Sequence, residues 1–245
     1  MVKLKHWRRV LPALLVIPAL ASGAEGTLGL HAHMDDDPVR AMVLLDRFEW
    51  QDADAGSALA WNLQAWVGTD KHRLLLRAEG DRVAGNTEEN RLELLWSQPL
   101  NSRWDLVAGL RQDLEPASAR SYAAFGVQGL APGWVHLEGT AYLGERGQTA
   151  ATLEATTDVL LTNRLLLTPR LEVQAYGRDD ETNGIGSGLA EIAVGLRLRY
   201  EIRREFAPYV GAEWTRKTGD TAGFARQAGE TVRSARWVAG VRAWF

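Results

Sequence analysis

The sequence predicts an all-β protein: an antiparallel transmembrane β-barrel of about 12 strands, of the bacterial outer-membrane type. Three observations predict this fold class. The chain ends in an alternating strand that finishes on an aromatic residue, it begins with an export signal, and it repeats short segments of alternating apolar and polar residues in between. Side chains of a strand point alternately to opposite faces, so such a segment can present one face to lipid and the other to water.

The last ten residues show this alternation most clearly. One face carries Trp237, Ala239, Val241, Ala243 and Phe245, and the other carries Arg236, Val238, Gly240, Arg242 and Trp244. An apolar stripe on one side and arginines on the other suit a wall between lipid and water. We expect this strand to close the barrel by pairing with the first strand, near Met42.

Residues 1–24 have the three parts of a secretory signal: a basic start, a short apolar core, and small residues at the exit. The core, residues 10–20, is too short to cross a bilayer of about 30 Å as a helix. A membrane anchor or an amphipathic surface helix is the alternative. Cleavage after Ala24 or Ala21 fits the small residues. The expected organisation is therefore a signal peptide at 1–24, a short periplasmic leader at 25–38 and an outer-membrane barrel at 39–245.

Composition narrows the function classes. The chain has 28 basic and 31 acidic side chains, and four of the basic ones lie in the signal, so the remaining chain is acidic and nucleic acid is not an expected partner. It has no cysteine, which excludes disulfides, thiolate metal ligands and a cysteine nucleophile. No apolar run outside the signal reaches the roughly 18 residues that a helical span needs.

The middle of the chain divides into segments of alternating hydropathy separated by polar or glycine-bearing turns. With the terminal strand, they lie near residues 40–51, 60–67, 72–82, 91–96, 104–111, 120–130, 135–143, 148–161, 165–177, 191–201, 209–215 and 234–245. An even number of strands fits a single-chain bacterial barrel.

The connections fall into two classes. Residues 100–103, 161–164 and 203–205 predict short periplasmic turns. Longer extracellular loops are predicted at 81–89, 112–121, 177–188 and 217–233, the last with a short helical turn.

A soluble β-sandwich also shows alternation and is the competing interpretation. The polar faces here are charged, which fits a narrow hydrated lumen where carboxylates and guanidiniums pair. These residues are Arg73, Arg77, Glu79, Arg91, Glu93, Arg111, Glu138, Glu172, Arg197, Arg199, Glu201, Glu213 and Arg242. Nine of the ten tryptophans follow the signal, mostly near segment ends, where a membrane interface would place them.

The leader contains the candidate metal ligands, His31, His33 and Met34, followed by three aspartates. Imidazole suits Cu(II) and Zn(II), and a thioether selects Cu(I). A solvated polar leader with incidental histidines is the alternative. His136 is expected in the lumen beside Glu138, with a structural role. No set of nucleophile, base and acid is recognisable, so we expect no enzyme; a barrel lipase or protease is the less favoured reading.

Several longer stretches resemble the copper resistance protein B family. They are residues 33–38 (HMDDDP), 124–132 (AFGVQGLAP), 184–189 (GIGSGL) and, most specifically, 195–211 (GLRLRYEIRREFAPYVG). The resemblance covers about residue 33 to Phe245.

This resemblance implies a barrel in the outer membrane of a Gram-negative bacterium, with copper ions and membrane lipid as partners. It implies that the protein binds copper and contributes to its sequestration or its outward movement from the periplasm. A periplasmic multicopper oxidase is the implied protein partner, and a barrel that docks this oxidase while binding little metal is the alternative. Family members often carry a long leader rich in Met and His, whereas this chain keeps only His31, His33 and Met34 before Asp35.

Overall fold

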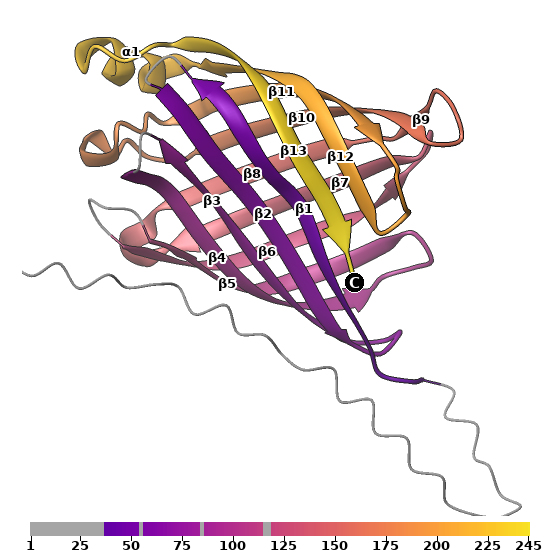
Figure 1. Ribbon diagram of the computed structural model, residues 1–245. Coiled ribbons are helices and arrows are strands. Elements are labelled where there is room, and N and C mark those ends of the chain that lie inside the picture. The colour runs from indigo at the N-terminus through magenta and orange to yellow at the C-terminus, as the bar shows by residue number, and fades with distance from the viewer. Residues whose placement is uncertain (1–36, 54–55, 84–85, 115–118) are drawn as a thin grey trace, which may run out of the picture. The chain divides into compact units, whose positions relative to one another are not determined.

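The computed structural model describes residues 37–53, 56–83, 86–114 and 119–245, and these form a closed antiparallel β-barrel of 12 strands (Figure 1). The strands are β1 (Arg40–Ala53), β2 (Gly56–Gly68), β3 (Arg73–Val83), β4 (Asn86–Pro99), β5 (Trp104–Asp113), β6 (Arg120–Ala131), β7 (Val135–Gly144), β8 (Thr149–Thr156), β9 (Val159–Leu160), β10 (Leu165–Tyr176), β11 (Gly188–Tyr200), β12 (Phe206–Lys217) and β13 (Arg233–Trp244). The short β9 continues the line of β8, because both pair with β10, so these two labels share one position in the wall. The predicted fold class is confirmed.

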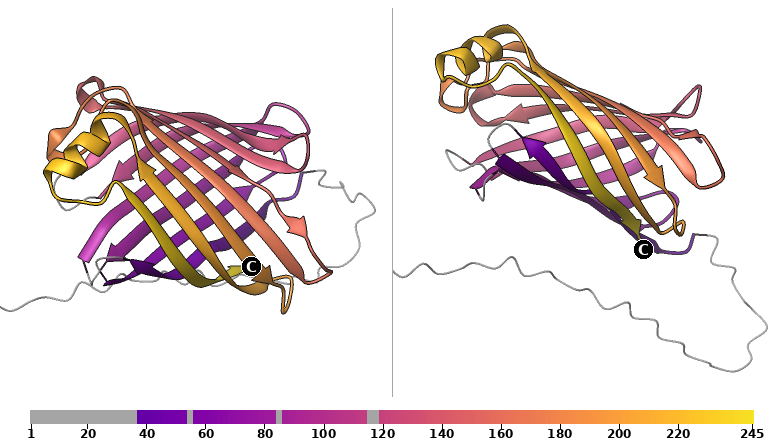
Figure 2. Two further views of the ribbon diagram at one scale, coloured as in Figure 1. Left: turned by 90° about the horizontal axis from the view of Figure 1, so that it is seen from above. Right: turned by 45° about the horizontal axis from the view of Figure 1, so that its top comes forward.

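The barrel closes between its first and last strands, as predicted. β13 pairs with β1 in antiparallel register, with Leu44 opposite Trp244. At the end of this seam the N–H of Val43 donates to the carbonyl of Phe245 at 3.0 Å, and the N–H of Phe245 donates back at 2.9 Å. β11 pairs with both β10 and β12, which completes the ring (Figure 2).

The alternation in the sequence becomes the two faces of the wall. Trp237, Leu110 and Val210 face outward and are 72%, 66% and 58% exposed. Glu49 and Arg197 face the lumen, where they are 0% and 6% exposed. The outer apolar side chains therefore form the surface that lipid would cover, and the charged side chains line the interior.

A β-bulge in β1 breaks this alternation once. The register shifts between Leu45 and Arg47 against β2, so that Asp46 is an extra residue in the strand. Asp46 and Arg47 consequently both line the lumen although they are neighbours in sequence. Strict alternation would place neighbouring residues on opposite faces, so it could not predict that both charges line the lumen.

The two ends of the barrel differ in their connections. The predicted short turns are confirmed between β4 and β5, between β9 and β10, and between β11 and β12, at the end where the C-terminus lies (Figure 1). We call this end the short-turn rim and the opposite end the long-loop rim.

One loop prediction is wrong. Residues 81–89 are mostly strand, because β3 runs to Val83 and β4 begins at Asn86. The paired backbone continues past the part of the wall where hydropathy alternates, so the sequence signal ends before the strands do.

The last long loop contains a helix of nine residues, α1 (Gly219–Gln227), where a helical turn was predicted. Two short 3-10 helices, η1 (Glu145–Gly147) and η2 (Glu181–Asn183), lie in the loops after β7 and β10. None of the helices in the described residues is long and apolar enough to cross a membrane. The predicted signal and the leader up to Asp36 lie outside the described residues.

Candidate functional site in the barrel lumen

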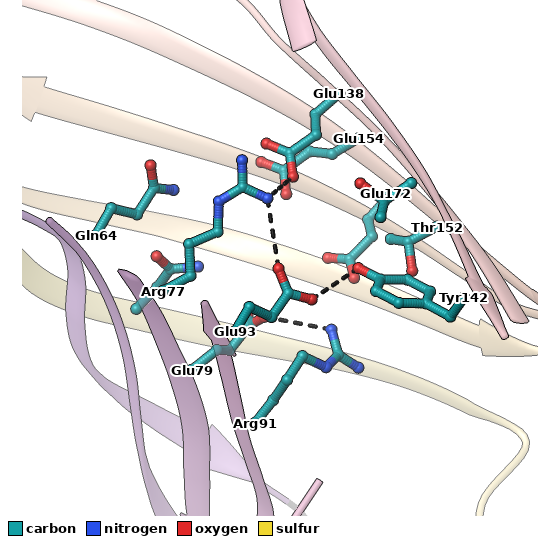
Figure 3. Close-up of a pocket in the computed structure, with 12 residues that line it drawn as sticks. Gln64, Arg77, Glu79, Arg91, Glu93, Glu138, Tyr142, Thr152, Glu154 and Glu172 are labelled. Atoms are coloured by element: carbon teal, nitrogen blue, oxygen red, sulfur yellow. Dashed lines mark hydrogen bonds and ion pairs between the residues drawn. The ribbon is translucent and has the colours of Figure 1, made fainter. Parts of the chain in front are cut away.

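The lumen contains two larger cavities with a layer of ion pairs between them. The cavity at the long-loop rim has a volume of about 1480 Å³, and the one at the short-turn rim has a volume of about 400 Å³. A third cavity of about 50 Å³ lies in the charged layer and has room for very few water molecules (Figure 3). Arg47 and Arg170 line both larger cavities, which places them at the boundary between the two chambers.

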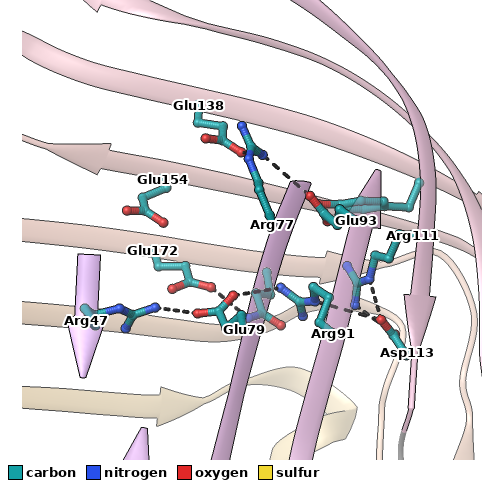
Figure 4. A network of polar contacts seen from close by, with 12 residues as sticks. Arg47, Arg77, Glu79, Arg91, Glu93, Arg111, Asp113, Glu138, Glu154 and Glu172 are labelled. Carbon is teal, nitrogen blue, oxygen red and sulfur yellow. Dashed lines mark hydrogen bonds and ion pairs between the residues drawn. The ribbon is translucent and has the colours of Figure 1, made fainter. Parts of the chain in front are cut away.

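One group of charges, which we call the mid-wall cluster, consists of Arg77, Glu93, Glu138 and Tyr142. Arg77 from β3 is hydrogen-bonded to Glu138 on β7 and lies 3.5 Å from Glu93 on β4 (Figure 4). The hydroxyl of Tyr142 donates to Glu93 at 2.8 Å. Arg77 also donates to the side-chain oxygen of Gln128 at 2.6 Å. The cluster therefore links β3, β4 and β7, and Gln128 connects it to β6.

A chain of alternating charges continues from this cluster. Glu79 accepts a hydrogen bond from Arg47 and lies 3.5 Å from Arg91 (Figure 4). Arg91 is 3.9 Å from Asp113, which accepts two hydrogen bonds from Arg111 at 2.7 and 2.9 Å. Buried carboxylates here are thus matched with guanidiniums, as desolvated charges require.

Three carboxylates lie side by side on the part of the wall formed by β7, β8 and β10. Glu138, Glu154 and Glu172 are direct cross-strand neighbours on β7, β8 and β10. Like charges in this arrangement repel. Arg170 offsets the repulsion with two hydrogen bonds to Glu154, at 2.9 and 2.8 Å, and an ion pair with Glu172 at 2.8 Å.

A second group, the seam cluster, consists of Glu49, Arg197, Tyr209 and Glu213. Arg197 on β11 donates to both carboxylate oxygens of Glu49 on β1, at 3.0 and 2.9 Å, and to Glu213 at 2.8 Å. The hydroxyl of Tyr209 donates to Glu49 at 2.9 Å, and the amide of Gln51 does so at 2.9 Å. These bonds join the first strand of the barrel to two of its last three.

Glycines make room for the seam cluster. A Cβ at Gly195 would lie 2.5 Å from Nη1 of Arg197, and a Cβ at Gly240 would lie 2.8 Å from the Tyr209 hydroxyl. The guanidinium and the phenol therefore lie against bare backbone. Any larger side chain at these positions would displace them.

The short-turn chamber has its own polar lining. His136 lines it together with Glu138, as predicted, although Glu138 is bonded to Arg77. Asp158 accepts hydrogen bonds from Arg199 at 2.8 Å and from Thr168 at 2.6 Å. No group of three or more His, Cys, Asp or Glu side chains that could hold a metal ion occurs within the described residues.

The described chain begins at this same rim. The carboxylate of Asp37 accepts a hydrogen bond from the backbone N–H of Asp70, in the turn between β2 and β3, at 2.8 Å. This bond lowers the pKa of the Asp37 carboxyl below its ordinary value. The predicted metal ligands His31, His33 and Met34 precede Asp37 and lie outside the described residues.

Sequence reasoning found most of the lumen charges but missed some of their partners. It did not single out Arg47, Glu49, Glu154 or Arg170, because their segments alternate less cleanly. Glu154 could have been found from the local run of Thr152, Glu154 and Thr156, which alternates with apolar residues.

The apolar outer wall, the charged lumen and the closed antiparallel sheet define an outer-membrane-type β-barrel protein. Among solved structures, the NanC porin is similar in fold, with a TM-score of 0.54 and 9% sequence identity over 83% of this chain and 99% of that one. At this identity the likeness concerns the fold alone.

Sequence comparison is more specific. The family model described as "Copper resistance protein B precursor (CopB)" matches residues 39–245. The chain is 51% identical over 210 residues to a copper resistance protein B homolog of Pseudomonas syringae pv. tomato, covering 86% of this chain and 71% of that protein. It is 45% identical over 230 residues to copper resistance protein B of Escherichia coli, covering 94% and 77%.

The chain therefore belongs to the copper resistance protein B family, which confirms the resemblance seen in the sequence and supports a role in copper resistance. Copper and membrane lipid both fit a barrel of this family. The word "precursor" in the family description agrees with export to the outer membrane.

Proposed function

We propose that this protein binds copper ions at the periplasmic rim of the outer membrane of a Gram-negative bacterium and contributes to their sequestration or outward movement from the periplasm. Outer-membrane barrels have short periplasmic turns and longer extracellular loops, which assigns the short-turn rim to the periplasm. The observation that carries the proposal is the tether of Asp37 to the turn between β2 and β3. It fixes the end of the leader at the rim where the chamber of about 400 Å³ opens.

The proposed ligands are His31, His33 and Met34. The last of them is only three residues before the tethered Asp37, so a copper ion held there stays close to the rim. Two imidazoles and a thioether serve both oxidation states of copper. In an extended leader, His31 and His33 lie on the same face, about 6–7 Å apart.

The lumen would let a copper ion pass only through the layer of ion pairs at its centre. Its central carboxylates are occupied by Arg47, Arg77 and Arg170, so a copper ion leaving the short-turn chamber would have to displace a guanidinium. Outward movement would therefore need rearrangement of the charged layer, and binding at the rim would not.

The test is titration of the refolded full chain with Cu(I) and with Cu(II). We expect the triple variant H31A/H33A/M34A to lose at least tenfold in affinity. H72A is the matched control, because His72 stacks on Trp96 with ring centroids 5.4 Å apart and takes no part in the leader. Equal copper binding by the wild type and the triple variant would remove the leader as the site.

We also propose that the protein is not an enzyme. No set of nucleophile, base and acid is recognisable in the sequence, which supports this proposal. Hydrolysis of phospholipid or peptide substrates that is lost in H136A would contradict it.

A barrel that docks a periplasmic multicopper oxidase is the alternative function. The charged layer supports it, because ion pairs across the middle of the lumen stiffen the barrel and leave a cavity of only about 50 Å³ between the two chambers. Mild crosslinking in cells should then capture the oxidase, and the H31A/H33A/M34A variant should capture it equally well. Absence of any crosslinked partner would count against docking.

A further inference from the structure

Three turns on the short-turn rim share one local structure. In each, a Thr or Asn side chain accepts hydrogen bonds from the backbone N–H groups two and three residues later, and its own N–H donates to the carbonyl three residues later. These capping residues are Thr69, Asn101 and Thr162. Such bonds mimic a backbone turn and fix its shape.

The residue two places after each cap is basic. Lys71, Arg103 and Arg164 occupy this position, so the repeated turn holds a cationic side chain in the same way at three places. The turn between β11 and β12 carries Arg203 and Arg204. Four hairpins of the rim therefore present at least one exposed cation each.

These cations have little to pair with inside the protein. Within the described residues the four arginines have no ion pair, and Lys71 is 76% exposed and 3.9 Å from Asp37. At the long-loop rim, Arg120 pairs with Asp180 at 3.2 Å and Lys217 pairs with Glu230 at 2.8 Å, and the exposed arginines there do not belong to a repeated turn. The arginines of these turns are thus available to an anionic group outside the protein.

Each arginine-bearing turn also exposes an aliphatic side chain. Leu100 and Leu161 precede the caps Asn101 and Thr162 and are 58% and 51% exposed, and Ile202 beside Arg203 is 53% exposed. A cation next to an exposed aliphatic group matches an amphiphile with an anionic head, and a guanidinium binds phosphate in bidentate fashion.

We propose that this ring of basic turns binds the phosphate headgroups of anionic glycerophospholipids in the periplasmic leaflet. The distribution of the cations favours lipid over a protein partner, because the turns lie at four positions around the closed sheet. A membrane surrounds the barrel on all sides, whereas a docked protein would cover one patch. The proposal rests on the orientation given under the proposed function and is independent of copper binding.

The experiment compares two charge-matched triple variants of the full-length refolded barrel. R103Q/R164Q/R203Q removes three rim arginines, and R216Q/R226Q/R233Q removes three exposed arginines at the other end. Native mass spectrometry in neutral detergent measures bound phosphatidylglycerol against phosphatidylcholine. Circular dichroism confirms that both variants are folded.

We expect the wild type and the R216Q/R226Q/R233Q control to prefer phosphatidylglycerol. The rim variant should lose about tenfold or more in apparent affinity for it, since each surface cation contributes to anionic lipid binding. The proposal is wrong if the wild type binds both lipids equally, or if both variants lose the preference to the same extent. It is also wrong if the rim variant keeps the preference and loses an acidic periplasmic protein that the wild type captures.

Copper titration of the same rim variant separates this proposal from the proposed function. Unchanged copper affinity with lost lipid preference supports the lipid ring. A loss of both would show that the arginines act on the leader, which would overturn the lipid proposal.

Discussion

The seam cluster and the mid-wall cluster have the same chemistry. In each, a tyrosine hydroxyl donates to a glutamate, an arginine pairs with that glutamate, and a second glutamate on another strand pairs with the same arginine. Tyr142 donates to Glu93 beside Arg77, and Tyr209 donates to Glu49 beside Arg197. The same arrangement therefore occurs twice in the lumen, once on β3, β4 and β7 and once on β1, β11 and β12.

The two clusters differ in what they connect. The mid-wall cluster joins β3 and β4, which are neighbours in the sheet, to β7, and its longest-range bond, between Arg77 and Glu138, spans 61 residues. In the seam cluster, Glu49 is separated from Arg197 by 148 residues and from Tyr209 by 160. Glu49 is also held by both of its oxygens and is 0% exposed. The seam cluster therefore joins the two ends of the barrel sequence and contributes to closing the barrel, whereas the mid-wall cluster joins strands that are closer together in sequence.

The largest expected effect comes from removing the charge of the central glutamate in each cluster. E49Q leaves the buried Arg197 with only Glu213, and we expect it to lower the free energy of unfolding by about 3 kcal/mol. E93Q leaves Arg77 with Glu138, and about 1 kcal/mol is expected. Urea unfolding of the refolded barrel, followed by tryptophan fluorescence, measures both. Equal losses of unfolding free energy in the two variants would show that the seam cluster does not stabilise the barrel more than the mid-wall cluster does.

The next effect concerns the space around the seam arginine. G195A places a Cβ 2.5 Å from Nη1 of Arg197, so the guanidinium must shift against its bonds to Glu49 and Glu213, at a cost of about 1 kcal/mol. G139A is the matched control, because its Cβ would meet nothing closer than the Leu153 side chain at 3.7 Å. The same urea series should show a loss for G195A and little change for G139A. A neutral G195A would mean that the Arg197 bonds reform in another geometry.

A smaller, local effect is expected at the long-loop rim. Gly186 donates its N–H to Thr221 in α1 at 2.9 Å, and a Cβ at Gly186 would overlap the backbone nitrogen of Thr221. G186A should therefore loosen α1 from the loop after β10 and speed proteolysis there several-fold. G223A, in the same helix and with open space at its Cβ, should leave the cleavage rate unchanged or lower it. Similar cleavage of both variants would show that this contact does not hold α1.

The sequence predicted the strands and their faces because alternation reports directly on which side meets lipid. The charged face of Arg197 and Arg199 and the apolar face of Leu196 and Leu198 are as predicted. The pairing of Arg197 with Glu49 could not be predicted, since it depends on how far strands are offset around the closed barrel.

The β-bulge in β1 could not be predicted from the sequence either. The bulge that turns both Asp46 and Arg47 into the lumen adds one residue without changing composition. The candidate copper ligands His31, His33 and Met34 remain a prediction. Their only structural support is the position of Asp37, from which the leader extends.

The smallest effect is expected at this entry to the seam, and it depends on pH. The N–H of Asp70 lowers the pKa of the Asp37 carboxyl, so the charged form is favoured in the folded protein. The tether is therefore fully present above the ordinary carboxyl pKa of 3.8 and is lost as the pH falls through the lowered value. Amide hydrogen exchange at Asp70 should be slow in the wild type and faster in D37A at neutral pH, with unchanged exchange in the strands. If D37A leaves the Asp70 amide protected, the leader is not tethered at this turn, and the seam begins at β1 without support from the residues before it.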